Sequence, residues 1–241
     1  MHKKSKKKPR NGLKTIWWNP QFVDKAILGV KEIPLCPTTA KGVPSKMITR
    51  EEAGRIYRKE IKEGNLAFHD DSFVCYYEDD YKFDSTRGIW FCPEKEMEVL
   101  KHFKGIITPD FSTYSDFPLP LRLWNTYRMR AFGYWASERG LEVINNVRGK
   151  YPDDLLFCFE GIETNSIVCV GTVASGLKEK ENWEPFKLWL NAMVEALKPR
   201  IILVYGSANY PFFVELKKRG IQIVSYEAST SKFWRGRKSH E

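Results

Sequence analysis

The chain has 241 residues, of which 42% are hydrophobic and 29% charged, and its formal net charge is +9. These proportions are typical of a globular protein that is long enough to bury a sizeable core. No apolar run approaches the roughly 18 residues that a membrane span requires, and no apolar segment follows the basic residues 1–10. We therefore expect a cytoplasmic protein with no secretory signal and no membrane partner.

The positive charge is concentrated at the two ends of the chain. Residues 1–10 carry +6 and residues 231–241 carry +3, so the rest of the chain is formally neutral. Tethered Lys and Arg side chains gain affinity for phosphates by releasing counterions, and an adjacent aromatic ring can stack on a base. The ends therefore indicate contact with nucleic acid, although basic tails also serve solubility alone. The residues expected to make this contact are Lys3, Lys4, Lys6, Lys7, Lys8, Arg10, Trp234, Arg235, Arg237 and Lys238.

Little regular structure is predicted before residue 49. Residues 1–12 are expected to be a disordered basic tail, because they are poor in apolar side chains and repel one another. Residues 13–48 contain several prolines and are expected to form an irregular arm. Thr49 is a candidate N-cap and Glu52 completes a capping box, so a helix should begin here and end near Gly64.

The next part of the chain has a weaker pattern. Residues 73–77 are rich in β-forming side chains and predict a strand. A second short strand is expected at 88–92, and a helix from about Pro93 to Phe103. The loop between the two strands contains an acidic cluster that we expect to be solvated. Its members are Asp79, Asp80 and Asp84.

From residue 106 onward, apolar strand candidates alternate with amphipathic helices. The strand candidates are 106–109, 142–147, 166–172, 201–205 and 222–225, and the helix candidates are 119–139, 182–197 and 211–219. Gly140, Pro199 and Gly220 mark the ends of these helices. Residues 155–159 predict either another strand or a short helix. We favour the helix, because a crossover between parallel strands needs a dozen or more residues.

This alternation predicts an α/β fold in which helices cover a parallel sheet. We expect five βα units in series, with one or two further strands at the N-terminal side. They would form an incomplete TIM-barrel-like or an open parallel sheet. Residues 49–230 would be a single α/β domain, and residues 231–241 a basic C-terminal tail, so that both termini are basic and disordered.

The strand near residue 107 and the helix after it carry the polar residues most typical of a site. Asp110 lies at the exit of the strand, where open α/β sheets and barrels bind ligands. Arg128 lies within an apolar stripe of the helix, where a guanidinium needs a carboxylate, a phosphate or carbonyl groups. Asn125 leans to the same side. We interpret Asp110, Arg128 and Asn125 as a catalytic constellation; a structural Asp110–Arg128 ion pair is the alternative.

The other strand exits add polar candidates. These are Asn145, Asn146 and Arg148 after the strand at 142–147, then Thr172, Ser207 and Glu227 after the later strands. Small hydroxyl residues ahead of a helix suit an anion, which makes GSANYP at 206–211 the best candidate loop. If the sheet closes, Asp110 and Glu227 would pair to bind a divalent metal such as Mg²⁺ or to act as acid and base.

Several classes of site have no support. The five cysteines show neither metal-ligand spacing nor a disulfide framework. His69 and His102 are isolated, which removes a His-based triad, and Ser207 lacks the G-x-S-x-G elbow of serine hydrolases. A sugar-acting barrel enzyme would require two opposed carboxylates, and only one strand-end acid is well placed.

The block TPDFSTYSDFPLPLRLWNTYRMRAFGYWASERGLEVINNV, followed by FCFEGI, SIVCVGT and IILVYGS, resembles the domain of unknown function 4417 family over roughly residues 50–230. The segments D-F-S-x-Y and N-x-Y-R-x-R are its most specific parts. The resemblance implies one α/β domain in a phage or mobile-element protein of a Gram-positive bacterial host cell, and it assigns no reaction. The family's most recognisable positions fall on Asp110, Ser112, Asn125, Tyr127, Arg128 and Arg130.

These observations predict a phage or mobile-element protein that engages nucleic acid or a nucleotide through its basic tails and a polar pocket. If it is catalytic, we expect metal-assisted phosphoester hydrolysis, with Asp110 as metal ligand or base. Arg128 would stabilise phosphate charge, and Asn125 would orient substrate or water. The alternative is a non-catalytic binding, accessory or host-antagonist protein. The expected ligand-binding residues are Ser112, Tyr127, Arg130, Asn145, Thr172, Ser207 and Glu227.

Overall fold

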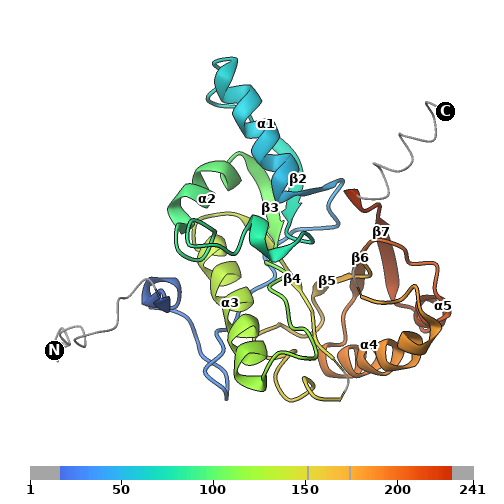
Figure 1. Ribbon diagram of the computed structural model, residues 1–241. Coiled ribbons are helices and arrows are strands. Elements are labelled where there is room, and N and C mark those ends of the chain that lie inside the picture. Colours follow the sequence, from blue (N-terminus) through green and yellow to red (C-terminus); the bar gives the residue numbers. More distant parts are fainter. Residues whose placement is uncertain (1–16, 151, 174, 230–241) are drawn as a thin grey trace, which may run out of the picture.

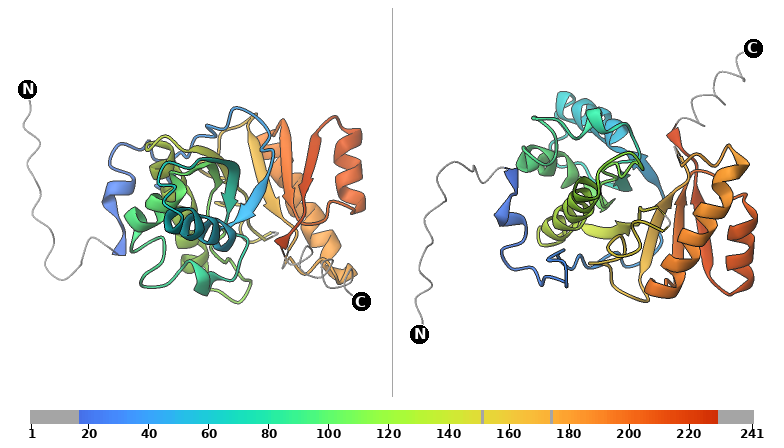
Figure 2. Two further views of the ribbon diagram at one scale, coloured as in Figure 1. Left: turned by 90° about the horizontal axis from the view of Figure 1, so that it is seen from above. Right: turned by 60° about the horizontal axis from the view of Figure 1, so that its bottom comes forward.

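The computed structural model describes residues 17–150, 152–173 and 175–229, and the strands of these residues form one parallel sheet. Its seven strands lie in chain order from β1 to β7, and each neighbouring pair is parallel. The sheet curls into an incomplete barrel with the helices on its outside (Figure 1, Figure 2). The expected α/β fold with an incomplete, TIM-barrel-like parallel sheet is confirmed.

The element bounds agree with most of the sequence predictions. The strands are β1 (Met47–Thr49), β2 (Asp70–Cys75), β3 (Phe103–Ile107), β4 (Glu142–Asn146), β5 (Ile167–Gly171), β6 (Ile201–Tyr205) and β7 (Gln222–Tyr226). The α-helices are α1 (Arg50–Lys62), α2 (Pro93–Leu100), α3 (Leu119–Ser137), α4 (Trp183–Leu197) and α5 (Pro211–Lys218). Short 3-10 helices are η2 (Pro20–Phe22), η3 (Asp80–Lys82) and η4 (Lys180–Asn182).

Alternate side chains of each strand point to opposite faces of the sheet. Phe73 and Ile107 pack in the cluster on the inner face, whereas their neighbours Val74 and Ile106 pack outward among the helices. Both faces are therefore apolar, as expected of a parallel sheet that is covered by helices outside and curled upon itself inside.

The helices cover the outer face of the sheet in two groups. α1, α2 and α3 pack against the first four strands around a core that contains Phe132 and Trp135. α4 and α5 pack against the last three strands around a core that contains Trp189 and Phe213. The loops at the carboxyl ends of the strands are left to form a site.

The start of α1 follows from its sequence. The Thr49 hydroxyl accepts a hydrogen bond from Glu52 N (3.2 Å), and Thr49 N donates to Glu52 Oε2 (2.9 Å). The predicted capping box is thus confirmed. Beyond the helix end, Gly64 has a φ of 80°, in the left-handed region that favours glycine.

Two local predictions between residues 85 and 103 are wrong. Residues 88–92 form turns instead of a strand, and Gly88 N donates to Ser85 O (2.8 Å). The helix expected to reach Phe103 ends at Leu100, because Phe103 is already paired in β3.

The crossover between β4 and β5 also differs from the prediction. Residues 155–159 form turns, neither the favoured helix nor a strand. The segment is organised around a buried ion pair, in which Arg122 of α3 donates to the Asp154 carboxylate. Lys150 N also donates to this carboxylate (2.8 Å). The chain around Asp154 therefore forms successive turns instead of a helix.

The arm before β1 is attached by a few specific hydrogen bonds. Asn145 Nδ2 donates to Cys36 O (2.9 Å), and the Tyr226 hydroxyl donates to Pro44 O (2.5 Å). The tails predicted at residues 1–12 and 231–241 lie outside the described residues. In the part of the chain that the structure describes, no helix has the length and apolar character needed to cross a bilayer.

Candidate functional site

A cavity of about 260 Å³ opens at the carboxyl ends of β3, β4 and β5. Asp110 enters it from the loop after β3, while Asn146 and Arg148 enter it from the end of β4 and the following loop. Phe186 and Trp189 of α4 form another part of its lining. The cavity therefore lies where parallel α/β sheets place their ligand sites.

Asp110 is held by donors from β4 and the loop that follows it. Asn146 Nδ2 donates to Asp110 Oδ1 (2.7 Å), and the Arg148 guanidinium donates to Asp110 Oδ2. The amide of Asn146 is oriented in turn, because its Oδ1 accepts from the Tyr77 hydroxyl (2.8 Å) and its backbone N–H donates to the Thr108 hydroxyl (2.8 Å). This chain of hydrogen bonds fixes the Asp110 carboxylate beside a cation.

The electrostatics keep Arg148 charged and the Tyr77 hydroxyl protonated near neutral pH. Burial lowers the pKa of Arg148. The charge and hydrogen bond of Asp110, together with the charge of Asp80, raise it by more than burial lowers it, so the pKa lies above its ordinary value. Burial raises the pKa of the Tyr77 hydroxyl well above its ordinary value, and Cys169 and Asp110 add to the effect. Arg148 is therefore a permanent cation, and Tyr77 a permanent donor.

The rest of the lining combines aromatic rings with positive charge. Tyr114 is 51% exposed, and the Arg148 guanidinium lies 5.8 Å from the centre of its ring. The rings of Phe186 and Trp189 lie 5.5 Å apart between centroids. Lys150 is exposed at the same rim. Cations beside rings are the combination that proteins use to hold phosphates and stacked bases.

Two glycines permit the close packing around the cavity. A Cβ on Gly171 would lie 2.7 Å from the ring of Tyr77. A Cβ on Gly149 would lie within 2.8–2.9 Å of Cys158 and Trp189. Larger residues at either position would displace the side chains that shape the site.

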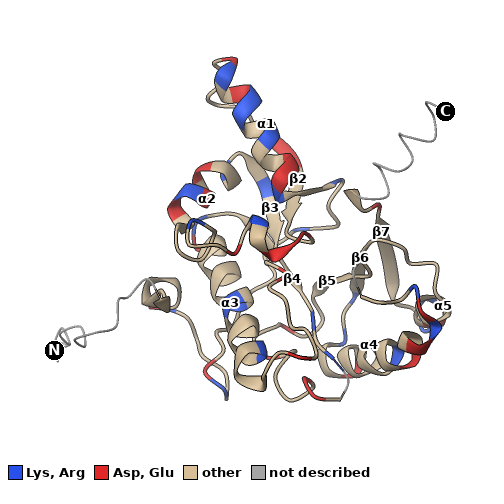
Figure 3. Ribbon diagram, in the orientation of Figure 1, with Lys and Arg blue, Asp and Glu red and all other residues tan. Residues whose placement is uncertain are grey.

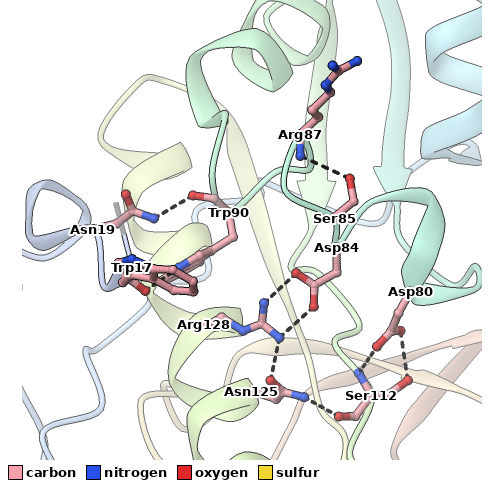
Figure 4. Close-up of polar contacts among 10 residues, drawn as sticks. All are labelled: Trp17, Asn19, Asp80, Asp84, Ser85, Arg87, Trp90, Ser112, Asn125 and Arg128. Atoms are coloured by element: carbon pink, nitrogen blue, oxygen red, sulfur yellow. Dashed lines mark hydrogen bonds and ion pairs between the residues drawn. The ribbon is translucent and has the colours of Figure 1, made fainter. Parts of the chain in front are cut away.

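Arg128 lies outside this cavity and clamps a loop (Figure 4). Its guanidinium donates to both oxygens of Asp84 (2.7 and 2.8 Å) and to Asn125 Oδ1 (2.6 Å), and it lies 3.8 Å from the centre of the Phe111 ring. The expected pairing of Arg128 with Asp110 is wrong. The loop between β2 and α2 brings Asp84 to the face of α3, so each arginine has its own carboxylate.

The acidic loop is bonded instead of uniformly solvated. Asp79 is exposed, but Asp80 accepts hydrogen bonds from Ser112 N (3.2 Å) and from the Ser112 hydroxyl (2.9 Å). Asn125 Nδ2 donates to Ser112 O (2.5 Å), so Ser112 is held from two sides. Burial raises the pKa of Asp80 above its ordinary value, although the hydrogen bonds from Ser112 and the charge of Arg148 oppose the shift. These contacts fix the segment that carries Tyr114 to the cavity.

Three further candidates are parts of the framework. Arg130 is fully buried and donates to the carbonyl oxygens of Asn146 (2.9 Å), Cys158 (3.1 Å) and Glu160 (3.2 Å). Burial lowers the pKa of Arg130 to about 10, so it is still charged at neutral pH. As described above, Asn145 holds the N-terminal arm. Tyr127 stacks on Trp124 at an interplanar angle of 11°, beside a second cavity near that arm.

Three candidates at the later strand exits do not line the cavity either, although Gly171 and Val173, on both sides of Thr172, do. The Thr172 hydroxyl donates to Ser207 O (3.0 Å), and the exposed Ser207 accepts from Asn209 N (3.1 Å) through its hydroxyl. Glu227 follows β7, which three strands separate from β3. The sheet is open between β1 and β7, so the condition for pairing Asp110 with Glu227, a closed sheet, is not met.

The residues around Asp110 do not fit a divalent metal. Its two carboxylate oxygens face an amide N–H and a guanidinium, whereas Mg²⁺ is bound by oxygen ligands. Across residues 17–150, 152–173 and 175–229, no three His, Cys, Asp or Glu side chains gather as a metal site would. Both oxygens of Asp110 are therefore occupied by donors of the protein.

Ten of the described residues were expected to have a catalytic or ligand-binding role; Asp110 lines the cavity, whereas the other nine do not. Asn146 and Arg148 were noted as strand-exit residues, but no role was predicted for them. The available signal was their position at the end of the buried strand β4 and just after it. Tyr114 and Phe186 gave no such signal, because the sequence does not distinguish an aromatic residue that binds a ligand from one that only packs in a helix or lies on the surface. The ten basic and aromatic residues predicted in the tails lie outside the described residues.

Comparisons with known proteins agree with the resemblance seen in the sequence. The chain is 34% identical over 137 residues to the Gene 1 protein of Mycobacterium phage L5, covering 56% of this chain and 57% of that protein. It is 32% identical over 137 residues to the Gene 1 protein of Mycobacterium phage D29, covering 56% and 48%.

The chain thus spans about half the length of these phage relatives. No solved structure shows significant similarity. Residues 31–227 match the family described as Domain of unknown function (DUF4417). Since this match covers most of the chain, the protein belongs to that family, whose relatives here are phage proteins.

Proposed function

We propose that this protein binds nucleic acid or a nucleotide in the cavity at the carboxyl ends of β3, β4 and β5. A phosphate would lie on Arg148 and Lys150, and a base would stack on Tyr114 or Phe186. The cavity, at about 260 Å³, is near the lower end of the usual size of ligand pockets, about 300–1,000 Å³. It would therefore take one nucleotide unit at a time.

The observation that carries this proposal is the incomplete pairing of Arg148. One bond to Asp110 uses one of the five guanidinium N–H groups, and 25% of the side chain is exposed. A planar guanidinium with free donors at a cavity is suited to a phosphate, which it can bind through two parallel hydrogen bonds. The first turn of α4 lines the same cavity and adds a favourable field for an anion.

Asp110 acts in this proposal as a positioning residue. Its charge holds Arg148 at the cavity, and Asn146 and Tyr77 hold Asp110. This arrangement favours a non-catalytic binding protein over a metal-assisted hydrolase. The basic residues of the tails would add phosphate contacts outside the cavity.

The test is a binding titration of the full chain with labelled single-stranded DNA, single-stranded RNA, duplex DNA and a mononucleotide. Arg148→Gln should weaken the binding of at least one of these ligands by about 10- to 100-fold, as expected for a charged hydrogen bond. Lys104→Gln removes the same charge from an exposed position of β3 and should leave binding unchanged. Equal affinities for wild type and Arg148→Gln would overturn the proposal.

The same titration separates binding from cleavage. It is run with Mg²⁺, with Mn²⁺ and with chelator, and the labelled nucleic acids are then examined on a gel. Intact ligand under all three conditions is the expected result. Metal-dependent cleavage that disappears in Asp110→Asn would instead assign Asp110 to a reaction.

A further inference from the structure

The outer half of α1 projects beyond the rest of the molecule (Figure 1). Its buried residues, Ala53 and Gly54, both lie near its start, where Thr49 caps the helix. From Arg55 to Lys62 the helix has no fully buried side chain. This half of α1 contributes little to the core, so its surface composition is free to serve another purpose.

The projecting half of α1 carries several basic residues, with an acidic residue, Glu60, among them (Figure 3). The exposed cations are Arg55, Arg58, Lys59 and Lys62, and we call them the α1 basic stripe. With 3.6 residues per turn, they fall within an arc of about 100°, and they extend over about 10 Å of helix. No other helix of the described residues exposes more than two cations.

The acidic residues of α1 form no ion pair with the stripe. Glu51 forms an ion pair with Lys82 (2.8 Å), and Glu52 completes the capping box. Glu60 accepts a hydrogen bond from Asn65 (2.7 Å). None of the ion pairs among the described residues includes a member of the α1 basic stripe, whereas Arg50 at the base of the helix is paired with Glu96. The charge of the stripe is available to a partner.

The chemistry of the stripe favours a nucleic-acid backbone over a membrane surface. Membrane-surface helices bury large apolar side chains opposite their basic face. In α1, all of which the structure describes, no large apolar side chain is exposed, since Ile56, Tyr57 and Ile61 lie half-buried. A basic face without an apolar one matches the regular negative charge of a phosphodiester chain.

We propose that the α1 basic stripe binds the phosphodiester backbone of a nucleic acid, for which duplex DNA is the probe used below. This inference rests on the proposed function, in which the ligand is a nucleic acid or a nucleotide. It narrows that ligand to a polymer, because a single nucleotide bound in the cavity would not contact the stripe. The stripe supplies affinity that depends on salt and not on sequence.

The experiment measures binding of a duplex of about 20 base pairs to the full chain at several salt concentrations. The variant Arg55→Gln/Lys62→Gln is compared with Lys217→Gln/Lys218→Gln, which removes two charges from the end of α5. The slope of log K against log salt should fall in magnitude by about 1.8 for the α1 variant, as expected for two lost phosphate contacts. The α5 variant should keep the slope of the wild type.

Three outcomes would overturn the inference. One is an unchanged slope in the α1 variant, and another is an equal change in both variants, which would indicate net charge alone. The third is binding to vesicles containing phosphatidylserine that is lost in the α1 variant while duplex binding persists. Circular dichroism of the α1 variant verifies that the helix still forms.

The cavity variant separates this inference from the proposed function. If Arg148→Gln weakens mononucleotide binding while the α1 variant does not change duplex binding, the cavity proposal stands and the stripe proposal fails. If the α1 variant weakens duplex binding while Arg148→Gln changes no ligand, the stripe proposal stands and the cavity proposal fails.

Discussion

Two arginines near the loop after β3 have opposite surroundings. Arg128 donates to Asp84 and Asn125 through three hydrogen bonds, lies over Phe111, and has a side chain that is 8% exposed. Arg148 has one bond to its carboxylate, and its side chain is 25% exposed at a cavity. Arg128 gives three hydrogen bonds to the protein, and its Nε is buried without a partner, so it holds a loop in place. Arg148 keeps donors at the cavity, where they can bind a ligand. Burial of an arginine therefore does not by itself mark a functional site.

Removing Arg128 should give the largest effect, and it should act on stability. Arg128→Met leaves the Asp84 carboxylate and Asn125 without their partner, so we expect a loss of about 3–5 kcal/mol in the free energy of unfolding. Chemical denaturation measures it. The double variant Arg128→Met/Asp84→Asn should lose less, because the unpaired charge is also removed. An Arg128→Met protein with wild-type stability and lost ligand binding would reverse the roles of the two arginines.

Removing the ring of Tyr114 should act on binding. Tyr114 is exposed and contacts Phe117 and Arg148, so Tyr114→Ala should barely change stability. Loss of a stacked base costs about 1–3 kcal/mol, which weakens single-stranded nucleic-acid binding by about 5- to 100-fold. Tyr114→Phe keeps the ring and is the matched control. Equal losses in the two variants would point to the hydroxyl instead of stacking.

Neutralising Asp110 should strengthen phosphate binding while it weakens the fold. Asp110→Asn removes a negative charge beside Arg148 and keeps the hydrogen bond from Asn146. In a partly exposed site, the repulsion between the Asp110 charge and a bound phosphate is about 1 kcal/mol. Its removal should raise the affinity for a mononucleotide about three- to tenfold. Calorimetric titration checks this. A fall in affinity would show that losing the position of Arg148 outweighs removing the negative charge beside the phosphate.

The pH dependence of Asp80 should give the smallest effect. Burial raises its pKa in the folded protein, so the folded state holds the proton more tightly than the unfolded state. Its contribution to stability is therefore full below the ordinary carboxyl pKa and is lost as pH rises through the raised pKa. The stability difference between wild type and Asp80→Asn should shift in favour of the wild type as pH falls from neutral through this window. Denaturation curves at several pH values measure it, and a shift in the opposite direction would contradict the assignment.

The candidate site could be located from sequence only to a region. Asp110 was placed correctly because a polar residue at the end of a buried strand must lie at the carboxyl edge of the sheet. Arg128 was expected to pair with it because Asp110 is the nearest acid along the β–α unit. The actual partner, Asp84, lies 44 residues away in sequence, on a loop whose path no local pattern reveals.

The sequence by itself determined the alternation of strands and helices from residue 106 onward, the capping box of α1 and the apolar character of both sheet faces. These features depend on interactions between residues close together in the chain, so their periods and spacings are readable. Only the tertiary structure decided which carboxylate meets which arginine and which side chains reach the cavity. It also left the outer half of α1 exposed. Such contacts depend on the curvature of the sheet and on irregular loops, which bring together groups that are far apart in sequence.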